Sequence, residues 1–336
     1  MARVNPTAAV TAGIMFGLAG GLVAGTYLLA PSLSGSPIGG VSDKLAVAEH
    51  DAAVYQAQAQ SADSYIADIA EDTVRGRLAD KPVVLITTPS VNEEDFGHID
   101  WLSKIGGAPS VTRITLTDSF LTQDSAEPLK SLAATTLPAG IQLSEDNRSV
   151  GTHMGELIGA TLSESPTNVA APSDSPSSEQ SESPEDEGEN ENQGGQKPST
   201  SPVGQDERNL VFGALKEAGY LSYEGDVPTA AAVVLVTGDS DGREDSFRVS
   251  QYVDFARALD KSGLPTTVAG RLPAAGPDGL IGKLRTNQED ALSVSTVDSI
   301  DRFYGRLATV LATVEQISGG SGSYGTADKT DAVAPA

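Results

Sequence analysis

The feature that most constrains this chain is an uncharged, apolar segment near its N-terminus. No residue from Ala8 to Ala30 carries a charge, and most of them are apolar or glycine. A helix of about 20 such residues crosses the hydrocarbon core of a bilayer. Arg3 is the only charged side chain before this segment, and Asp43 is the first after it. Because positive charge favours the cytoplasmic side, we predict a single-pass anchor with its N-terminus in the cytoplasm and the bulk of the chain outside.

A cleaved signal peptide is the alternative interpretation of this segment. Val23-Ala24-Gly25 offers a small-x-small cleavage pattern. The apolar run, however, is longer than the roughly 7–15 residues of a signal peptide. Pro31 also follows Ala30, at the point where a cleaved chain would begin. We therefore favour an uncleaved anchor.

Glycine recurs every four residues within the same segment. At about 100° per residue, such a row stays on one broad face of a helix. Glycines there let two helix backbones approach closely, although glycine is also simply common in membrane helices. The row predicts packing of the anchor against a second helix. It consists of Gly13, Gly17, Gly21 and Gly25.

A long helical pattern follows the anchor, from residue 41 to residue 78. Its apolar positions alternate in steps of three and four, which is the a/d seam of a coiled coil. The pattern predicts a stalk that pairs with a second copy. The alternative is a single helix packed on its own domain, because an alanine-rich seam is weak. The seam consists of Leu45, Ala48, Ala52, Tyr55, Ala59, Ala62, Ile66 and Ile69.

Two similar patterns in the rest of the chain predict an α/β fold. Residues 82–87 and 232–237 are short, continuously apolar runs, typical of strands covered on both faces. Each is followed by an amphipathic helix and another strand, which predicts two β-α-β halves and a Rossmann-like parallel sheet. Further helices are predicted at the end of each half. The other predicted elements are helices at 92–105, 148–162, 248–260 and 300–317, and strands at 110–117 and 265–269.

The halves are separated by a low-complexity acidic segment. It consists of Ser, Pro, Glu, Asp, Gln, Asn and Gly and lacks apolar residues, so we expect it to be disordered. The predicted organisation comprises an anchor and connector at 1–40, a helical stalk at 41–78, the first α/β half at 79–164, the acidic insertion at 165–207, the second half at 208–318 and a flexible tail at 319–336.

Composition excludes several classes of function. A net charge of −24 disfavours nucleic acid, which is itself an anion. The chain has no cysteine, which excludes disulfides, thiolate catalysis and zinc-thiolate sites. Neither buried strand precedes a GxGxxG or GxxxxGK[ST] loop, and no GxSxG or HExxH motif occurs. We therefore predict a protein that is not an enzyme, without a cofactor and without catalytic residues.

Soft metal ligands are scarce. The three histidines, His50, His98 and His153, fall in separate segments and share no metal-ligand spacing. His153-Met154 is the one adjacent soft pair, and we interpret it as an ordinary pair in the first turn of a helix. The Gly238–Gly242 stretch resembles part of a calcium loop but has its glycine at the wrong position, so a polar turn is favoured. No metal site is predicted.

The order of the segments resembles one known family. After the anchor, the stalk and the first strand, the resemblance is carried by Leu137–Ser144, Val233–Gly238, Ser295–Asp301 (STVDSID) and Ser323–Thr326 (SYGT). The chain is similar to the mycobacterial copper transport protein B family (MctB) of actinobacterial outer-membrane copper transporters. The resemblance covers nearly the whole chain apart from the acidic insertion.

The resemblance implies a place in the cell envelope and a role in copper efflux, homeostasis or channel activity. The residues themselves do not favour a conducting barrel, because only 5% are aromatic and the strands are of the buried type. A related corynebacterial protein implies the alternative, a non-catalytic envelope scaffold that acts with a partner in septal cell separation. In either case we expect a homodimer formed through anchor and stalk, and a cytoplasmic or envelope protein as partner.

Overall fold

Two short apolar runs form the centre of a single sheet. The computed structural model describes residues 39–167 and 201–336, and in it β1 pairs in parallel with β4. The strand order is β3-β2-β1-β4-β5-β6-β7, and only β3 runs antiparallel to its neighbour. The strands are β1 (Val83–Thr87), β2 (Val111–Leu116), β3 (Leu221–Tyr223), β4 (Ala232–Val236), β5 (Thr266–Ala269), β6 (Ser295–Val297) and β7 (Ser323–Tyr324).

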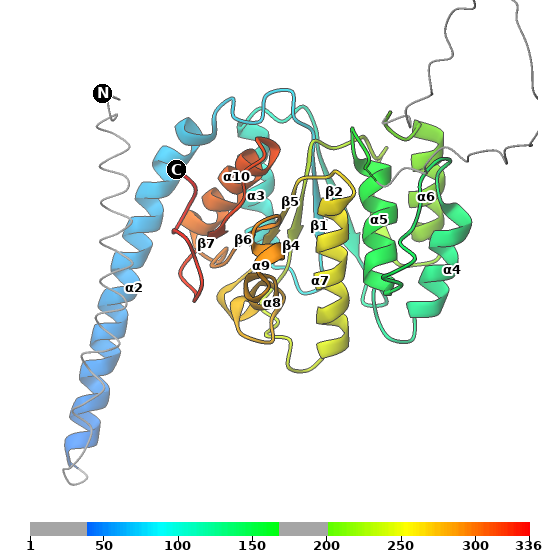
Figure 1. Ribbon diagram of the computed structural model, residues 1–336. Coiled ribbons are helices and arrows are strands. Elements are labelled where there is room, and N and C mark those ends of the chain that lie inside the picture. The colour runs from blue at the N-terminus through cyan, green and yellow to red at the C-terminus, as the bar shows by residue number, and fades with distance from the viewer. Residues whose placement is uncertain (1–38, 168–200) are drawn as a thin grey trace, which may run out of the picture.

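Helices cover both faces of this sheet, as Figure 1 shows. One face carries α2, α3 and α10, and the other carries α4 to α8. The helices are α2 (Gly39–Val74), α3 (Glu93–Ile105), α4 (Ala126–Thr136), α5 (Val150–Leu162), α6 (Gln205–Glu217), α7 (Ser246–Lys261), α8 (Leu280–Thr286), α9 (Gln288–Ala291) and α10 (Phe303–Ile317), with a 3-10 turn at Leu272–Ala275.

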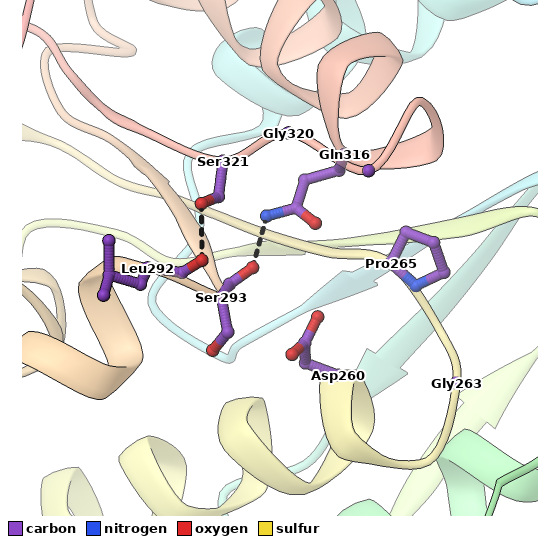
Figure 2. A pocket seen from close by; sticks show the side chains of 9 residues that line it. Asp260, Gly263, Pro265, Leu292, Ser293, Gln316, Gly320 and Ser321 are labelled. Atoms are coloured by element: carbon purple, nitrogen blue, oxygen red, sulfur yellow. Dashed lines mark hydrogen bonds between the residues drawn. The ribbon is translucent and has the colours of Figure 1, made fainter.

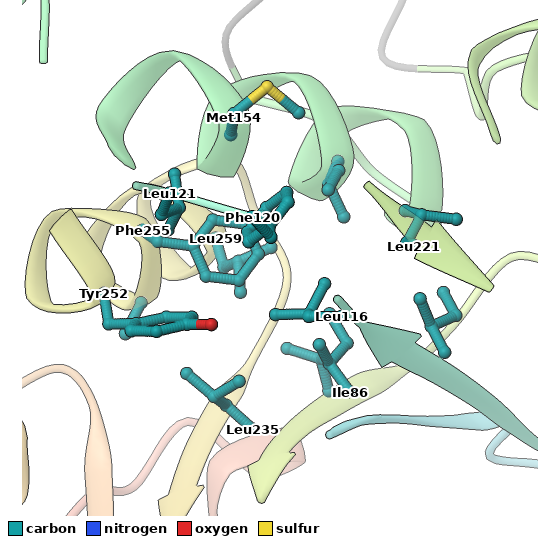
Figure 3. Close-up of a cluster of buried hydrophobic side chains, with 14 of the residues drawn as sticks. Ile86, Leu116, Phe120, Leu121, Met154, Leu221, Leu235, Tyr252, Phe255 and Leu259 are labelled. Atoms are coloured by element: carbon teal, nitrogen blue, oxygen red, sulfur yellow. The ribbon is translucent and has the colours of Figure 1, made fainter. Parts of the chain in front are cut away.

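The continuously apolar strands are explained by this layering. Successive side chains of β1 alternate between the two faces, so Val83 and Leu85 enter one core while Val84 and Ile86 enter the other. All five residues of β1 and of β4 are buried. Figure 3 shows the second core, in which Ile86 lies below the aromatic and aliphatic side chains of the covering helices.

The predicted β-α-β halves are confirmed, and they share one sheet. The first is β1-α3-β2 and the second is β4-α7-β5, with β1 and β4 side by side at the middle. Local signals fix the helix ends: the Asn92 side chain accepts hydrogen bonds from the first-turn amides of Glu94 and Asp95, which caps α3. Because β2, β1, β4 and β5 are parallel neighbours, their C-terminal ends lie along one common edge, the carboxyl edge of the sheet.

The prediction of a flexible tail from residue 319 is wrong for its first part. Ser323 and Tyr324 form β7 and pair with β6, and both side chains are buried. The sequence around them is rich in glycine and serine, so no apolar pattern indicates a strand there. Its polar groups are satisfied by partners from distant segments, described below.

The C-terminal end of the predicted acidic insertion (165–207) is wrong by three residues, because α6 begins at Gln205. The buried Val203 side chain and the Arg208 guanidinium hold this boundary, since Arg208 donates to the backbone oxygens of Val203 and Val227. Most of the insertion lies outside the described residues. The same is true of the anchor and its glycine row.

No helix within 39–167 and 201–336 combines the length and the hydropathy that crossing a bilayer requires.

Candidate functional site

The last third of α2 is fixed to the domain. Ile66, Ala70 and Val74 are buried, and their spacing of four residues keeps them on one face of the helix. They join the core formed with α3 and α10. Just before them, the Asp63 carboxylate pairs with the Nε of Arg302 at 2.8 Å. This end of α2 therefore belongs to the α/β domain.

The first half of α2 extends beyond that domain (Figure 1). Nearly every side chain from Val47 to Gln58 is exposed. The exposed residues include Val47, Val54 and Tyr55, whose side chains are large and apolar. Isolated helices of this size are marginal in water, and packing supplies most of the stability of a helix. The exposure of residues 47–58 shows that the described part of the domain leaves this stretch of α2 largely uncovered.

The predicted seam is thus divided between two environments. From Ile66 onward the helix packs on its own domain, as in the alternative interpretation, and the side chain of Leu45 lies outside the described residues. Pairing with a second copy through the earlier positions stays a prediction. Ala48, Ala52 and Tyr55 are exposed, Ala59, Ala62 and Ile69 are half-buried, and Ile66 is buried.

The STVDSID and SYGT segments meet at the carboxyl edge of β6 and β7. The Asp298 carboxylate there accepts hydrogen bonds from Ser299 Oγ at 2.6 Å and from the backbone amide of Thr326 at 2.8 Å. Its other oxygen pairs with Arg285 Nη1 at 2.8 Å, and both charged side chains are buried. Arg285 also donates to the backbone oxygen of Tyr324. The pair thereby ties β6, β7 and α8 together.

Two backbone positions are required by this cluster. Ser299 has a φ of 63°, in the left-handed region that residues other than glycine rarely adopt. At Gly325, where φ is 127°, an added Cβ would lie 2.2 Å from Asp298 Oδ1. Both positions let the backbone amides close around the carboxylate. Because its oxygens already accept four hydrogen bonds, we interpret Asp298 as a structural residue that holds β6, β7 and α8 together.

A second buried carboxylate lies at the same edge of the sheet. Asp95 of α3 accepts hydrogen bonds from Arg271 Nε and Arg306 Nη2, both at 2.7 Å. The hydrogen bond that Arg271 donates to Asp95 raises the pKa of the Arg271 guanidinium. Arg306 also lies 3.1 Å from His98 Nδ1 and donates to the backbone oxygen of Ile300. Arg306 pairs with Glu94 Oε1 as well, at 3.3 Å, so two carboxylates balance the two guanidinium groups of a network that joins α3, the end of β5 and α10.

The crevice between β1 and β4 is where an α/β sheet of this topology usually binds its ligand. Here the two loops touch: an added Cβ at Gly238 would lie 2.0 Å from the backbone oxygen of Ser90. Beyond it, the Asp241 carboxylate accepts from the Arg243 amide, and Ser240 Oγ accepts from the Gly242 amide. The Gly238–Gly242 stretch is therefore a polar turn rather than an open calcium loop.

The His153-Met154 pair is separated by the fold. Met154 is fully buried and lies among Phe120 and Leu121 (Figure 3). His153 faces the other way, with Nε2 3.1 Å from the backbone oxygen of Ser144. The two side chains cannot ligate one ion in this arrangement. Across the described parts of the chain, no three His, Cys, Asp or Glu side chains are grouped so that they could hold a metal ion.

Sequence reasoning missed a second glycine row, in α5. Gly151, Gly155 and Gly159 recur every four residues and face α7. At Gly151 an added Cβ would lie 2.1 Å from the backbone oxygen of Gln251, so the two helices touch through their backbones. The same spacing that singled out the N-terminal segment would have identified this contact. Asp298 lies in the STVDSID segment that carries the family resemblance, but no sequence pattern marks Arg285 as its partner 13 residues earlier.

Comparison with known proteins agrees with the segment order noted above. The profile of the family described as "Copper transport outer membrane protein, MctB" matches residues 1–335. Copper transporter MctB of Mycobacterium tuberculosis (strain ATCC 25618 / H37Rv) is 31% identical over 271 residues, which are 79% of this chain and 76% of that protein. Copper transporter MctB of Mycobacterium leprae (strain TN) is 26% identical over 255 residues, 74% of this chain and 71% of that protein.

These matches confirm the resemblance and support a copper-related function in the cell envelope. The profile spans the N-terminal apolar segment, α2 and both halves of the sheet, so the relationship is not limited to one part of the chain. This chain belongs to the MctB family of copper transport outer membrane proteins.

Proposed function

We propose that this protein serves copper transport as an envelope component held by its N-terminal segment, with the α/β domain on the outer side, and that two copies pair through the projecting half of α2. The observation that carries the proposal is the division of α2. One end is fastened to the domain by Ile66, Ala70 and Val74, whereas the other end presents exposed apolar side chains. A helix so arranged is suited to join its domain to a second helix.

A second copy is the partner that fits the seam. In a symmetric dimer each seam residue meets its own counterpart, so one self-complementary stripe is sufficient. Ala52 and Tyr55 occupy neighbouring a and d positions, and both are exposed. The stripe is alanine-rich and short, so it contributes weak pairing by itself. We expect the glycine row of the predicted anchor to contribute the remaining attraction between the two copies.

The positions of the possible copper ligands favour a role of the dimer in copper transport. They do not favour capture of copper by the isolated domain. Copper is held by soft sulfur or by imidazole ligands that converge on one ion. The one adjacent soft pair diverges, since Met154 is in the core and His153 is held by the Ser144 backbone. We therefore expect the domain to contribute to copper transport through assembly and through its partners.

Cysteine crosslinking tests the pairing directly, because the chain contains no cysteine of its own. Ala52→Cys places a thiol on the seam, and Ala57→Cys, a matched alanine on the opposite side of the same exposed helix, is the control. In membranes we expect rapid disulfide-linked dimers from Ala52→Cys and few from Ala57→Cys. Equal crosslinking of the two variants, or none in either, contradicts the proposed seam.

Function is tested with charged substitutions at the same two positions. Ala52→Glu places like charges opposite each other in the pair and should leave a deletion strain copper-sensitive, whereas Ala57→Glu should restore tolerance.

Direct copper binding is tested by a separate experiment. Calorimetric titration with Cu(II), and with Cu(I) under a competing chelator, should reveal no one-to-one site tighter than about micromolar. A saturable site that His153→Ala abolishes would refute the assembly role and restore direct copper capture.

A further inference from the structure

An open pocket with a few polar groups in a largely apolar lining lies at the amino edge of the sheet, away from both charged clusters. Its volume is about 310 Å³, at the lower limit of small-ligand sites. Figure 2 shows it between the ends of α7 and α10 and the segment that precedes β6. The lining residues are Asp260, Gly263, Pro265, Leu292, Ser293, Gln316, Gly319, Gly320 and Ser321.

Two side-chain oxygens point into this cavity. Figure 2 shows the Asp260 carboxylate and the Gln316 amide oxygen both directed toward its open middle. The orientation of Gln316 is fixed, because its Nε2 donates to the backbone oxygen of Ser293 at 2.7 Å and to Ser295 Oγ at 3.0 Å. Its oxygen is consequently left on the cavity side. The Ser321 hydroxyl is turned away, since it donates to the backbone oxygen of Leu292.

The backbone adds negative potential at the same place. Helices α7 and α10 are 16 and 15 residues long, and both end at the cavity. The C-terminus of a helix carries a partial negative charge of about half an elementary charge. Burial raises the pKa of Asp260 to about 6, while a hydrogen bond with Ser293 and the charge of Lys261 act in the opposite direction. At neutral pH the cavity therefore contains a carboxylate between two negative helix ends.

We propose that this cavity binds an organic cation that donates hydrogen bonds, an alkylammonium group, with Asp260 as counter-ion and Gln316 Oε1 as second acceptor. A metal ion fits less well, because calcium and magnesium take six or more oxygen ligands and the cavity is much larger than one ion. Apolar residues at the rim can contact the hydrocarbon stem of such a ligand. Leu292 is 72% exposed there, and Pro265 lies on the other side. The ammonium comes from a free amine or from a lysine side chain of a partner.

The test is calorimetric titration of the full chain in lipid nanodiscs at pH 7.5. The two probes are 1,4-diaminobutane, for a free amine, and a tripeptide Ala-Lys-Ala with blocked ends, for a lysine side chain. 1,4-Butanediol, which has the same stem without the charge, should not bind. Binding of the diamine alone assigns the site to free amines, and binding of the tripeptide alone assigns it to a lysine side chain. Binding of neither probe overturns the proposal.

Variants locate the binding. Asp260→Asn should weaken binding at least tenfold, whereas Asp239→Asn, the same change at an exposed position beyond the opposite edge of the sheet, should leave it unchanged. Leu292→Lys places a competing ammonium at the exposed rim without disturbing the core, so it tests the same site while the Asp260 carboxylate is kept. At pH 5 the affinity of the unmodified chain should fall about tenfold, because only about a tenth of Asp260 remains ionised at one unit below a pKa of about 6. Affinity insensitive to Asp260→Asn and to Leu292→Lys refutes the assignment.

Discussion

Replacing Gly155 with alanine probes how closely α5 packs on α7. An added Cβ at this position would lie 2.5 Å from the backbone oxygen of Phe255 and 2.6 Å from the Cβ of Ala258. Ordinary contacts at a Cβ are 3.4 to 4 Å. Neither neighbour is the flexible end of a side chain, so the helices must separate by roughly 1 Å, and the core beneath α5 loosens.

The magnitude follows from two opposing effects. Overpacking of this kind costs about 1–3 kcal/mol of unfolding free energy. Removing a glycine from a helix interior returns about 0.5–1 kcal/mol, because alanine has less backbone freedom to lose. We therefore expect Gly155→Ala to destabilise the protein by about 1–2 kcal/mol. With a urea m-value near 3 kcal/mol per M, the unfolding midpoint should fall by about 0.5 M.

Gly213→Ala is the matched control. Gly213 is also inside a helix, α6, but an added Cβ there would meet nothing within 4 Å. Only the backbone effect remains, so this variant should be more stable by about 0.5–1 kcal/mol. Urea denaturation of the chain from Gly39 onward, followed by circular dichroism, measures both. The reasoning is refuted if the two variants shift the midpoint in the same direction.

Three further predictions concern charged groups and the insertion. Asp298→Ala should lower the unfolding free energy by about 3–5 kcal/mol, seen by thermal melting, because it leaves the buried Arg285 unpaired; an unchanged melting temperature would show that the pair is dispensable. The raised pKa of Asp260, about 6 against an ordinary 3.8, means that its ionised form destabilises the folded state above pH 6, and that this penalty disappears as the pH falls toward 4. Asp260→Asn should therefore stabilise the protein by up to about 3 kcal/mol at pH 7.5 and not at pH 4, and a gain equal at both pH values would contradict this. Replacing residues 168–200 with a short Gly/Ser linker should change the melting temperature by only a few degrees, since loop length costs about 0.6 kcal/mol per doubling; loss of expression would show that the insertion packs.

The centre of the fold can be predicted from local patterns in the chain. Two runs of consecutive apolar residues specify strands buried on both faces, because only such strands need apolar side chains at every position. The amphipathic helix after each run then requires a parallel sheet. The order of the segments was also sufficient to identify the family, and an extended match with known members confirmed it.

The edge strands of the sheet, the buried ion pair and the pocket depend instead on contacts between segments that are distant in sequence. Strands β6 and β7 are short and rich in hydroxyl groups, so no apolar pattern marks them. They are buried because Arg285 and Asp298, 13 residues apart, satisfy polar groups across three elements. The cavity likewise needs Asp260 and Gln316 at the ends of two helices that only the sheet brings together.

The division of α2 illustrates the same distinction. Its heptad spacing was readable, but a spacing states only which side chains share a face and not what covers that face. Ile66 is covered by the chain's own core, whereas Ala52 is left exposed although it belongs to the same stripe. The difference arises because the α/β domain reaches only the last third of a helix 36 residues long. Periodicity is a local property of the sequence, whereas the burial of a helix face depends on how the rest of the chain packs against it.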